Sequence, residues 1–255
     1  MEIKDKTVVI TGGASGLGLA TAQELSRQGA KIAIWDLNRE AGEATAGEFG
    51  DNAIFSPVDV SDEASVAEAV KAVIAKFGTI HVAINCAGIG IPAKLLGKEG
   101  PVDMKGWTKT IMINLIGTVN VIRLAAQQMN LNSPNPDGER GVIVNTASVA
   151  AYEGQIGQTS YAASKAGIIG VTLPAAREFA PLGIRVVTIA PGLFETPMMM
   201  GLPEKVQEAL GMSVPFPSRL GRPAEYAGLV AHIIENSMIN GETIRLDGAL
   251  RMAPR

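Results

Sequence analysis

The sequence predicts an α/β fold: a single domain built on a doubly wound, Rossmann-type parallel sheet, expected to have seven strands. Short apolar runs rich in β-branched residues alternate with helical patterns along the chain, and no repeat, low-complexity segment or linker interrupts them. A glycine-rich turn directly follows the first run. Such alternation produces parallel strands with right-handed crossovers, so ligands are expected at the carboxyl ends of the strands.

Each strand is predicted from a short apolar run. The runs have the length and β-branched content of buried strands and are bounded by polar residues or glycine. They cover residues 7–10, 31–35, 53–58, 80–85, 141–146, 185–190 and 243–246.

The helices are predicted from apolar residues that recur at helical spacing. After the third strand, Ser61 is in position to cap a helix that carries Val66, Val70 and Val73 on one face and ends before Gly78. Further helical patterns cover residues 17–28, 107–129 and 161–179.

The turn after the first strand reads Thr11-Gly12-Gly13-Ala14-Ser15-Gly16-Leu17-Gly18. Its glycines leave the backbone bare, so a diphosphate can reach main-chain N–H groups at the positive end of the following helix. The spacing Gly-x-x-x-Gly-x-Gly is wider than the usual Gly-x-Gly-x-x-Gly dinucleotide fingerprint. We expect a dinucleotide site here; the alternative is an ordinary glycine-rich loop.

Asp36 ends the second strand, 18 positions after Gly18. An acid at this point can accept hydrogen bonds from an adenosine ribose diol and would repel a 2′-phosphate. Ser15 precedes Gly16 and offers no cation for that phosphate, although Arg39 is close in sequence. The sequence therefore favours NAD over NADP, and the alternative role for Asp36 is a strand-end turn.

Tyr161 and Lys165 are four residues apart in a predicted helix, so their side chains share one face. An ammonium at about 4 Å, at an effective dielectric of about 20, is worth roughly 4 kcal/mol, or about three pKa units of a tyrosine. The pair therefore predicts a tyrosine whose pKa is lowered toward neutrality and which transfers protons. The alternative is a solvated surface pair.

Composition excludes several classes of function. The formal net charge of −3, without runs of like charge, provides no electrostatic footprint for nucleic acid or an anionic membrane. Small molecules or copies of the chain itself are the expected partners. His81 and His232 lack ligand-like spacing, so no metal site is expected.

Cellular location is predicted from cysteine content and the first residues. Cys86 is the single cysteine, which fits a reducing compartment. No apolar stretch reaches about 18 residues, and residues 1–6 lead straight into the first strand without a cleavable signal. We expect a cytoplasmic protein.

Several motifs together resemble the short-chain dehydrogenase/reductase family over essentially the whole chain. They are the glycine turn, Asp59, Asn85-Cys86-Ala87-Gly88, Asn114, Ser148, Tyr161-x-x-x-Lys165 and Pro191-Gly192. Residues 141–148, 190–194, 214–220 and 240–249, with the loop 132–140, are more narrowly similar to the type II 3-hydroxyacyl-CoA dehydrogenases, also called 17β-hydroxysteroid dehydrogenase type 10. That branch also shares Cys86 in place of the family's common Asn.

The resemblance implies a role for each matching residue. Tyr161 would take the proton from a substrate hydroxyl that Ser148 holds, and Lys165 would lower the pKa of Tyr161 and bind the nicotinamide ribose. Asn114 would anchor a water that joins Lys165 to solvent. The implied NAD contacts are Gly12, Ser15, Gly16, Leu17, Gly18, Asp36, Asp59, Val60, Cys86, Ala87, Gly88, Tyr161, Lys165, Pro191, Phe194 and Thr196.

Some of these residues have plainer alternatives. Ser148 and Asn114 can serve as caps or braces, and Cys86 can be a packed small apolar group. The run Met198 to Met200, with Met212 nearby, fits a lid over an apolar substrate or a subunit interface equally well.

The implied activity is NAD-dependent oxidation of a secondary alcohol by a homotetramer. The favoured substrate is a 3-hydroxyacyl-CoA; a hydroxysteroid and a noncatalytic NAD-binding scaffold are the alternatives. Residues 1–255 form one domain, with a substrate loop or lid at about 191–223. Lys94, Lys98 and Lys105 lie either in a solvated loop or at a site for CoA phosphates.

Overall fold

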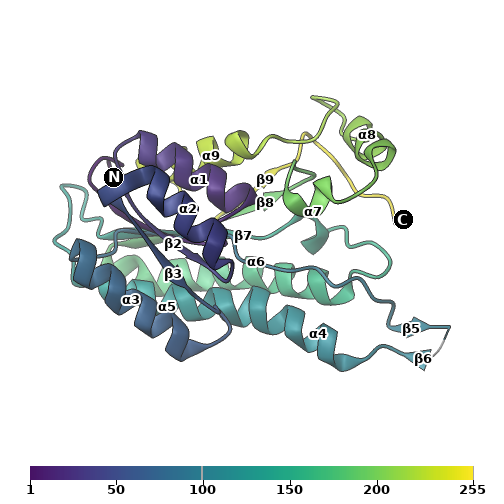
Figure 1. The fold of residues 1–255 in the computed structure, drawn as a ribbon, viewed down its shortest axis with the longest axis horizontal. Helices are drawn as coiled ribbons and strands as arrows, with labels where there is room; N and C mark the ends of the chain where they lie inside the picture. The colour runs from purple at the N-terminus through teal and green to yellow at the C-terminus, as the bar shows by residue number, and fades with distance from the viewer. Residues whose placement is uncertain (99, 255) are drawn as a thin grey trace.

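A seven-stranded, all-parallel sheet forms the centre of the molecule in the computed structural model, which describes residues 1–98 and 100–254 (Figure 1). The strand order is β3-β2-β1-β4-β7-β8-β9, so the direction of winding reverses between β1 and β4. The strands are β1 (Thr7–Thr11), β2 (Lys31–Asp36), β3 (Ala53–Pro57), β4 (Val82–Asn85), β7 (Gly141–Thr146), β8 (Ile184–Pro191) and β9 (Thr243–Leu246). This confirms the predicted sheet and its seven strands.

Helices cover both faces of the sheet (Figure 1). On one face lie α1 (Gly16–Arg27), α2 (Arg39–Phe49) and α9 (Pro223–Glu235); on the other lie α3 (Glu63–Phe77), α4 (Met104–Ile111), α5 (Gly117–Met129) and α6 (Thr159–Phe179). Two short helices, α7 (Pro197–Met200) and α8 (Glu204–Met212), and a small hairpin, β5 (Leu96–Gly97) with β6 (Gly100–Pro101), lie outside these layers.

The core consists of one apolar layer on each face of the sheet. Along β2, Ile32 and Ile34 pack into the layer under α1 and α9, while Ala33 and Trp35 pack into the layer that contains α3 and α5 residues. All four side chains are almost completely buried. Apolar residues on both faces are what a parallel sheet covered by two helix layers requires.

Two local predictions need correction. Asp62, rather than Ser61, caps α3, because its side chain accepts from Ala64 N while the Ser61 hydroxyl donates to Asp59. The helix predicted at 107–129 begins at Met104 and contains a π-helical turn at Met112–Ile116. The helix ends before Gly78 as predicted, and the structure shows Gly78 in the left-handed conformation.

The continuous helical segment Met104–Met129 is the one described helix whose length and composition would allow it to cross a membrane. Its most apolar window has a mean hydropathy of 1.3 and is half buried in the protein. Asn114 and Asn120 on this segment are buried and hydrogen-bonded to main-chain groups elsewhere in the fold. Core helices meet the same length and composition condition, and this one packs against the sheet.

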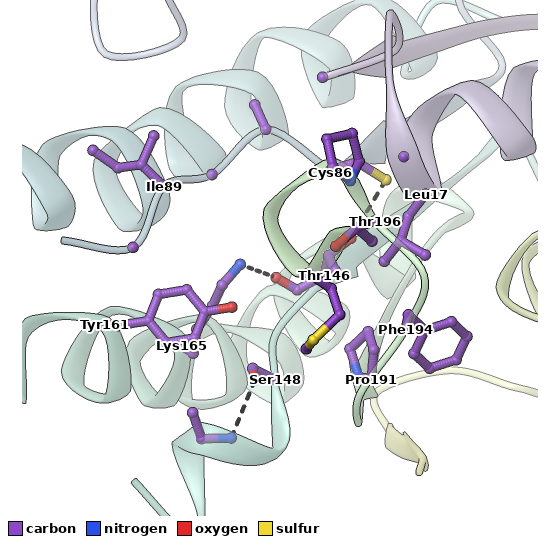
Figure 2. Close-up of a pocket in the computed structure, with 18 of the residues that line it drawn as sticks. Leu17, Cys86, Ile89, Thr146, Ser148, Tyr161, Lys165, Pro191, Phe194 and Thr196 are labelled. Atoms are coloured by element: carbon purple, nitrogen blue, oxygen red, sulfur yellow. Dashed lines mark hydrogen bonds between the residues drawn. The ribbon is translucent and has the colours of Figure 1, made fainter. Parts of the chain in front are cut away.

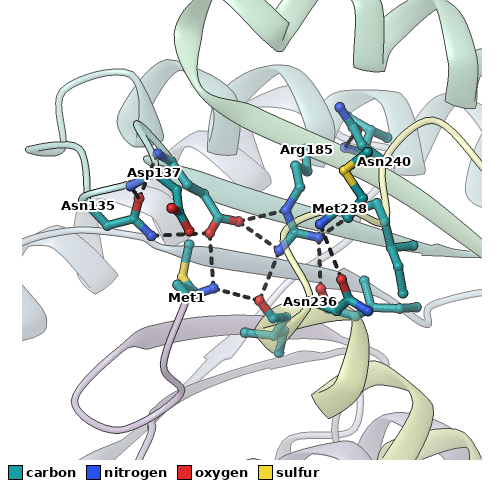
Figure 3. Close-up of polar contacts among 12 residues, drawn as sticks. Met1, Asn135, Asp137, Arg185, Asn236, Met238 and Asn240 are labelled. Carbon is teal, nitrogen blue, oxygen red and sulfur yellow. Dashed lines mark hydrogen bonds and ion pairs between the residues drawn. The ribbon is translucent and has the colours of Figure 1, made fainter.

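A buried ionic network joins the amino end of β8 to α9 and to the loop before β7 (Figure 3). The Arg185 guanidinium donates to Glu139 Oε1 at 2.7 Å and to the carbonyls of Ile233, Ile234 and Ile239 at 2.8–2.9 Å. The Met1 amino group donates to Glu139 Oε2 at 3.0 Å. Because Arg185 and Glu139 are 7% and 5% exposed, each needs its partner.

Arg185→Met should therefore destabilise the fold by about 3–5 kcal/mol, because it leaves the Glu139 carboxylate buried without its guanidinium. The double variant with Glu139→Gln should lose clearly less than the two single losses added together. Urea unfolding measures both. As a control, Glu68→Gln breaks an exposed pair with Lys71 and should change stability by less than about 1 kcal/mol. Additive losses in the double variant would show that Arg185 and Glu139 do not act as a pair.

Candidate active site

One pocket of about 820 Å³ opens at the carboxyl ends of the strands. It brings together every predicted site residue except Asn114, although they come from widely separated parts of the chain. At one end lie the glycine turn and Asp36, and at the other lie Ser148, Tyr161 and Lys165. The pocket is therefore long enough to join the predicted dinucleotide site to the predicted catalytic group.

The glycine turn exposes backbone at the start of α1. Gly12 has φ 63°, and a Cβ there would lie 3.0 Å from Ala87 N; a Cβ on Gly18 would lie 2.2 Å from Gly12 O. Ser15 is the N-cap but its side chain makes no capping bond, and the first turn of α1 carries no acid. The free N–H groups and the helix dipole therefore favour an anion at this point.

Asp36 combines the two roles considered for it. Its Oδ2 accepts from Ala14 N at 3.1 Å and its Oδ1 from Asn38 N at 3.0 Å, so the carboxylate holds the glycine turn against the end of β2. It also lines the pocket. Arg39, the nearest cation in sequence, is paired with Glu43 at 3.0 Å.

Two further predicted contacts, Asp59 and Val60, line the same end of the pocket. Asp59 Oδ1 accepts from the main chain and the hydroxyl of Ser61, which fixes the turn after β3. Asn120 donates to Val60 O and holds the other side of this turn. The wall at this end is thus a braced loop with an apolar side chain available for a flat ligand.

Tyr161 and Lys165 lie side by side on α6, with Ser148 close to the tyrosine (Figure 2). Lys165 Nζ is 5.7 Å from the centre of the Tyr161 ring and donates to Thr146 O at 2.7 Å. Lys165 is only 4% exposed, and its burial lowers its pKa to about 8. The predicted pairing on one helix face is confirmed, and the alternative of a solvated surface pair is wrong.

The predicted lowering of the Tyr161 pKa is not what the structure gives. Burial raises the pKa of the phenol, and a hydrogen bond with Ser148 lowers it by less. The Lys165 ammonium donates to the Thr146 carbonyl, and no hydrogen bond joins it to the phenolic oxygen. Burial also lowers the pKa of Lys165, so its charged form is less favoured. The spacing of the two residues does not reveal the desolvation that both groups undergo, and desolvation disfavours their charged forms.

Ser148 lies near Tyr161 and also begins a short turn after β7. Its Oγ accepts from Ala150 N at 3.1 Å and caps the short 3₁₀ turn Val149–Ala151. The capping alternative is therefore also correct. The cap fixes the hydroxyl just beyond the carboxyl end of β7, in the pocket that Tyr161 also lines, and the hydroxyl opposes the rise in the Tyr161 pKa.

Asn114 is fully buried in the π-helical turn and does not line the pocket. Its amide accepts from Ile89 N at 2.8 Å and donates to Ile89 O at 2.9 Å and Ser164 Oγ at 3.0 Å. A Cβ on Gly88 would lie 3.3 Å from Asn114 Oδ1 and 3.5 Å from Lys165 Nζ. Asn114 is therefore a positioning residue that holds the loop after β4 against Lys165, and its link to a water remains a prediction.

Cys86 behaves as a packed group. Its sulfur lies 3.7 Å from the Tyr226 hydroxyl and accepts from Thr146 Oγ1 at 3.5 Å, and burial raises its pKa. A thiol held protonated in this way is a poor nucleophile. No group of three or more histidine, cysteine or acidic side chains within the described residues is placed to hold a metal ion.

The segment after β8 covers the pocket. Pro191, Phe194 and Thr196 line it, as do Met199, Leu202 and Leu210 from the two short helices. Phe194 is buried against Gly221, where a Cβ would lie 2.7 Å from its ring. The start of the segment therefore packs closely against the chain that follows α8. Met212 is 77% exposed and does not line the pocket; the side chain of Met198 lies outside the described structure.

Thr11, just outside the pocket, and three residues of the pocket wall had no assigned role from the sequence. Thr11 Oγ1 accepts from both Cys86 N and Ala87 N at 3.1 Å and so joins β1 to the loop after β4. Gln155, Gln158 and Met252 form part of the wall near Tyr161. Thr11 belongs to the glycine motif and could have been identified from it, whereas the other three carry no sequence signal. Lys94, Lys98 and Lys105 are exposed and do not line the pocket.

The model of the short chain dehydrogenase family matches residues 6–207. The chain belongs to this family. The 3-hydroxyacyl-CoA dehydrogenase type-2 of Homo sapiens is 56% identical over 99% of this chain and 97% of its own length, and that of Drosophila melanogaster is 52% identical over 99% and 100%. The crystal structure of 3-hydroxyacyl-CoA dehydrogenase type-2 from Mycobacterium avium superposes with a TM-score of 0.93 at 45% identity, covering 98% and 97% of the two chains.

This short-chain dehydrogenase is an oxidoreductase that uses a nicotinamide cofactor. The pocket fits that group, because bare glycine backbone and an uncapped helix start lie at one end and a buried tyrosine–lysine pair lies at the other. Gly12 to Gly18 would hold the diphosphate and Asp36 the adenosine ribose. The cofactor supplies the hydride chemistry, and the protein supplies orientation and proton transfer.

The rate of alcohol oxidation should rise with pH, because the ionised Tyr161 phenol accepts the proton and burial raises its pKa. Ser148→Ala should move the rising limb to higher pH, since it removes the hydrogen bond that opposes burial. Initial rates across about pH 6 to 11 measure the shift.

Tyr161→Phe is the companion variant, and it should lower the oxidation rate by about 10²–10⁴-fold while nicotinamide binding, followed by fluorescence titration, stays within severalfold. An unchanged pH profile in Ser148→Ala, or near-normal oxidation by Tyr161→Phe, would contradict the role of Tyr161 as the proton acceptor.

Proposed function

We propose that this protein oxidises the secondary alcohol of a 3-hydroxyacyl-CoA thioester to the 3-ketoacyl-CoA, reversibly, with NAD as the electron acceptor. The observation that carries the proposal is the near-full-length similarity to relatives that have this activity as their name, at 52–56% identity. The substrate end of the pocket agrees with it, because apolar residues such as Ile91, Leu202 and Met252 suit an acyl chain.

The proposed reaction moves one hydride and one proton. The bound nicotinamide would supply the acceptor for the carbinol hydrogen and its electron pair, and the phenolate of Tyr161 would take the hydroxyl proton, so the carbinol would become a carbonyl. Ser148 would hold the reacting oxygen beside the phenol, because its hydroxyl is already fixed by its bond from Ala150 N. Lys165, held by Thr146 O, would support the negative charge on Tyr161 when that residue ionises.

A hydroxysteroid is the second candidate substrate. The support is the same apolar wall: the pocket has a volume of about 820 Å³, and among the described residues none that lines its Ile91 and Leu202 end is charged, which suits a rigid hydrocarbon as well as an acyl chain. The exposed Lys94, Lys98 and Lys105 lie outside the pocket wall, so they do not favour CoA over a steroid.

A substrate panel tests the proposal. We expect 3-hydroxyacyl-CoA thioesters to give NADH with kcat/KM at least about tenfold above that for hydroxysteroids, a difference of about 1.4 kcal/mol in transition-state binding. The absorbance of NADH, followed with 3-hydroxybutyryl-CoA, 3-hydroxydecanoyl-CoA and a 17β-hydroxysteroid, measures the values of kcat/KM. If the steroid has the higher kcat/KM, the hydroxysteroid becomes the favoured substrate. If neither thioester is oxidised, the 3-hydroxyacyl-CoA proposal is refuted.

The choice of NAD over NADP rests on Asp36, whose carboxylate faces the pocket near the proposed ribose position. NADP would bring its 2′-phosphate beside this charge. Ser15 has no charge to offset the repulsion, and Arg39 is engaged by Glu43. NAD lacks that phosphate and can use the carboxylate as a hydrogen-bond acceptor.

We expect the kcat/KM for NAD to exceed that for NADP by about 30- to 1000-fold, equivalent to about 2–4 kcal/mol from one like-charge contact. Asp36→Asn should narrow the ratio, because the amide keeps an acceptor for Ala14 N without the charge. Asp51→Asn, which changes an exposed acid in the 3₁₀ turn after α2, is the matched control and should leave the ratio unchanged. Equal constants for the two cofactors in the unaltered protein would refute the role of Asp36.

Homotetramer formation and a cytoplasmic location stay predictions from the family resemblance and the sequence. Light scattering coupled to size exclusion decides the first, and imaging of the tagged full-length protein in its own cell decides the second.

A further inference from the structure

The chain after β9 returns to the active site and forms part of its wall. Met252 lines the pocket together with Gln155 and Gln158, although it lies about 90 positions from Tyr161 in sequence. Pro254 O accepts from Ile156 N at 3.1 Å, and Ala253 O accepts from Gln155 Nε2 at 3.0 Å. The tail 249–254 is therefore bound along the loop that leads into α6.

An ion-pair cluster holds this tail in place. Arg245 forms a two-point contact with the Glu153 carboxylate, at 2.7 and 3.0 Å, and donates to Asp247 Oδ2 at 2.7 Å and Leu250 O at 2.9 Å. Glu153 Oε2 also accepts from Met252 N at 3.2 Å, so one carboxylate joins β9 to the tail. Parallel N–H···O bonds of this kind fix geometry as well as providing energy.

The cluster is well shielded for an ionic group near the surface. Arg245 and Glu153 are each 21% exposed and Asp247 only 7%, and the guanidinium lies 5.0 Å from the ring centre of Tyr152. The bond from Arg245 lowers the pKa of Glu153, so the carboxylate keeps its charge at neutral pH. These observations separate it from the exposed ion pairs of the helices, such as Lys71 with Glu68.

The loop that the tail contacts has a special position. It comprises residues 152–158, between Ser148 and Tyr161, so it connects the two side chains that hold the reacting oxygen. The covering segment after β8 also begins beside the cluster, since a Cβ on Gly192 would lie 2.8 Å from Asp247 Cβ. Loop, tail and covering segment therefore meet at the Arg245 cluster.

We propose that Met252 is a specificity-determining residue for the apolar part of the substrate, and that the Arg245–Glu153 pair is the latch that holds it there. Met252 is the apolar side chain that the tail contributes to the wall, and its main chain is fixed by Glu153. A substrate with a short apolar group ends before reaching the tail, whereas a longer group contacts the thioether. The inference rests on the proposed function only for the choice of acyl-CoA probes.

The kinetic test compares two chain lengths. Met252→Ala should raise the KM for 3-hydroxydecanoyl-CoA roughly three- to tenfold more than that for 3-hydroxybutyryl-CoA, because only the longer chain loses its contact. Met252→Leu should restore most of the difference. Met238→Ala, which removes a methionine that is 91% exposed, is the matched control and should alter neither ratio. Equal effects on both substrates, or no effect on either, would overturn the role of Met252.

The latch is tested by Glu153→Gln, with Glu68→Gln as the control. The variant should shift the chain-length ratio in the same direction as Met252→Ala, and it should speed amide exchange at Ile156 and Met252, whose N–H groups bond to Pro254 O and Glu153. Unchanged exchange at both amides would remove the latch.

The unaltered protein separates the two proposals. If it oxidises neither thioester, the proposed function fails, and the Met252 comparison is made instead between the bulkiest and the smallest secondary alcohol that the protein does oxidise. A Met252→Ala effect confined to the bulky alcohol would support the specificity role even then, and equal effects on the two alcohols would refute it.

Discussion

The pocket depends on a close approach of two main-chain segments, the turn after β1 and the loop after β4. Thr11 Oγ1 accepts from two N–H groups of that loop, and a Cβ on Gly12 would lie 3.0 Å from Ala87 N. β1 and β4 are also the neighbours between which the sheet reverses its winding. A crevice opens at such a reversal, and the absence of side chains at its base lets a ligand reach the backbone. The same glycine atoms therefore determine both the packing of the strands and access to the site.

Burial sets the chemistry at the other end of this pocket. Removal of water raises the pKa of Tyr161 and lowers that of Lys165, so burial disfavours both charges that the reaction uses. Polar groups offset this cost: the Ser148 hydroxyl opposes the rise in the Tyr161 pKa, and Thr146 O accepts from the Lys165 ammonium. Thr146 is fixed in turn, since its hydroxyl lies 2.7 Å from that of Tyr226. The site thus combines a buried tyrosine and lysine with a few polar neighbours that stabilise their charged forms.

Local sequence patterns predicted the sheet and the glycine turn that follows β1, because these depend on short-range rules. A short apolar run such as Thr7–Thr11 suits a strand buried on both faces, and a glycine such as Gly78 suits the left-handed end of a helix. The direction of the Tyr161 pKa shift was mispredicted because it depends on burial, which the four-residue spacing to Lys165 does not contain. The break in the helix at Met112–Ile116 was missed because the apolar spacing of residues 107–129 carries no signal for it; Asn114 in that turn bonds to Ile89, a contact across the fold.

The substrate half of the pocket is positioned by contacts between distant parts of the chain, and local sequence patterns do not reveal such contacts. Its walls are the loop 152–158, the segment after β8 and the tail 249–254, none of which has strand or helix periodicity over its full length. Long-range polar contacts position them instead, above all Arg245 with Glu153, which are 92 positions apart. Because these contacts lie outside the sheet, the residues they hold can change without altering the cofactor site. A fold of this kind can therefore keep its proton-transfer and dinucleotide machinery while the chemistry of the bound alcohol is set by a few side chains on latched loops.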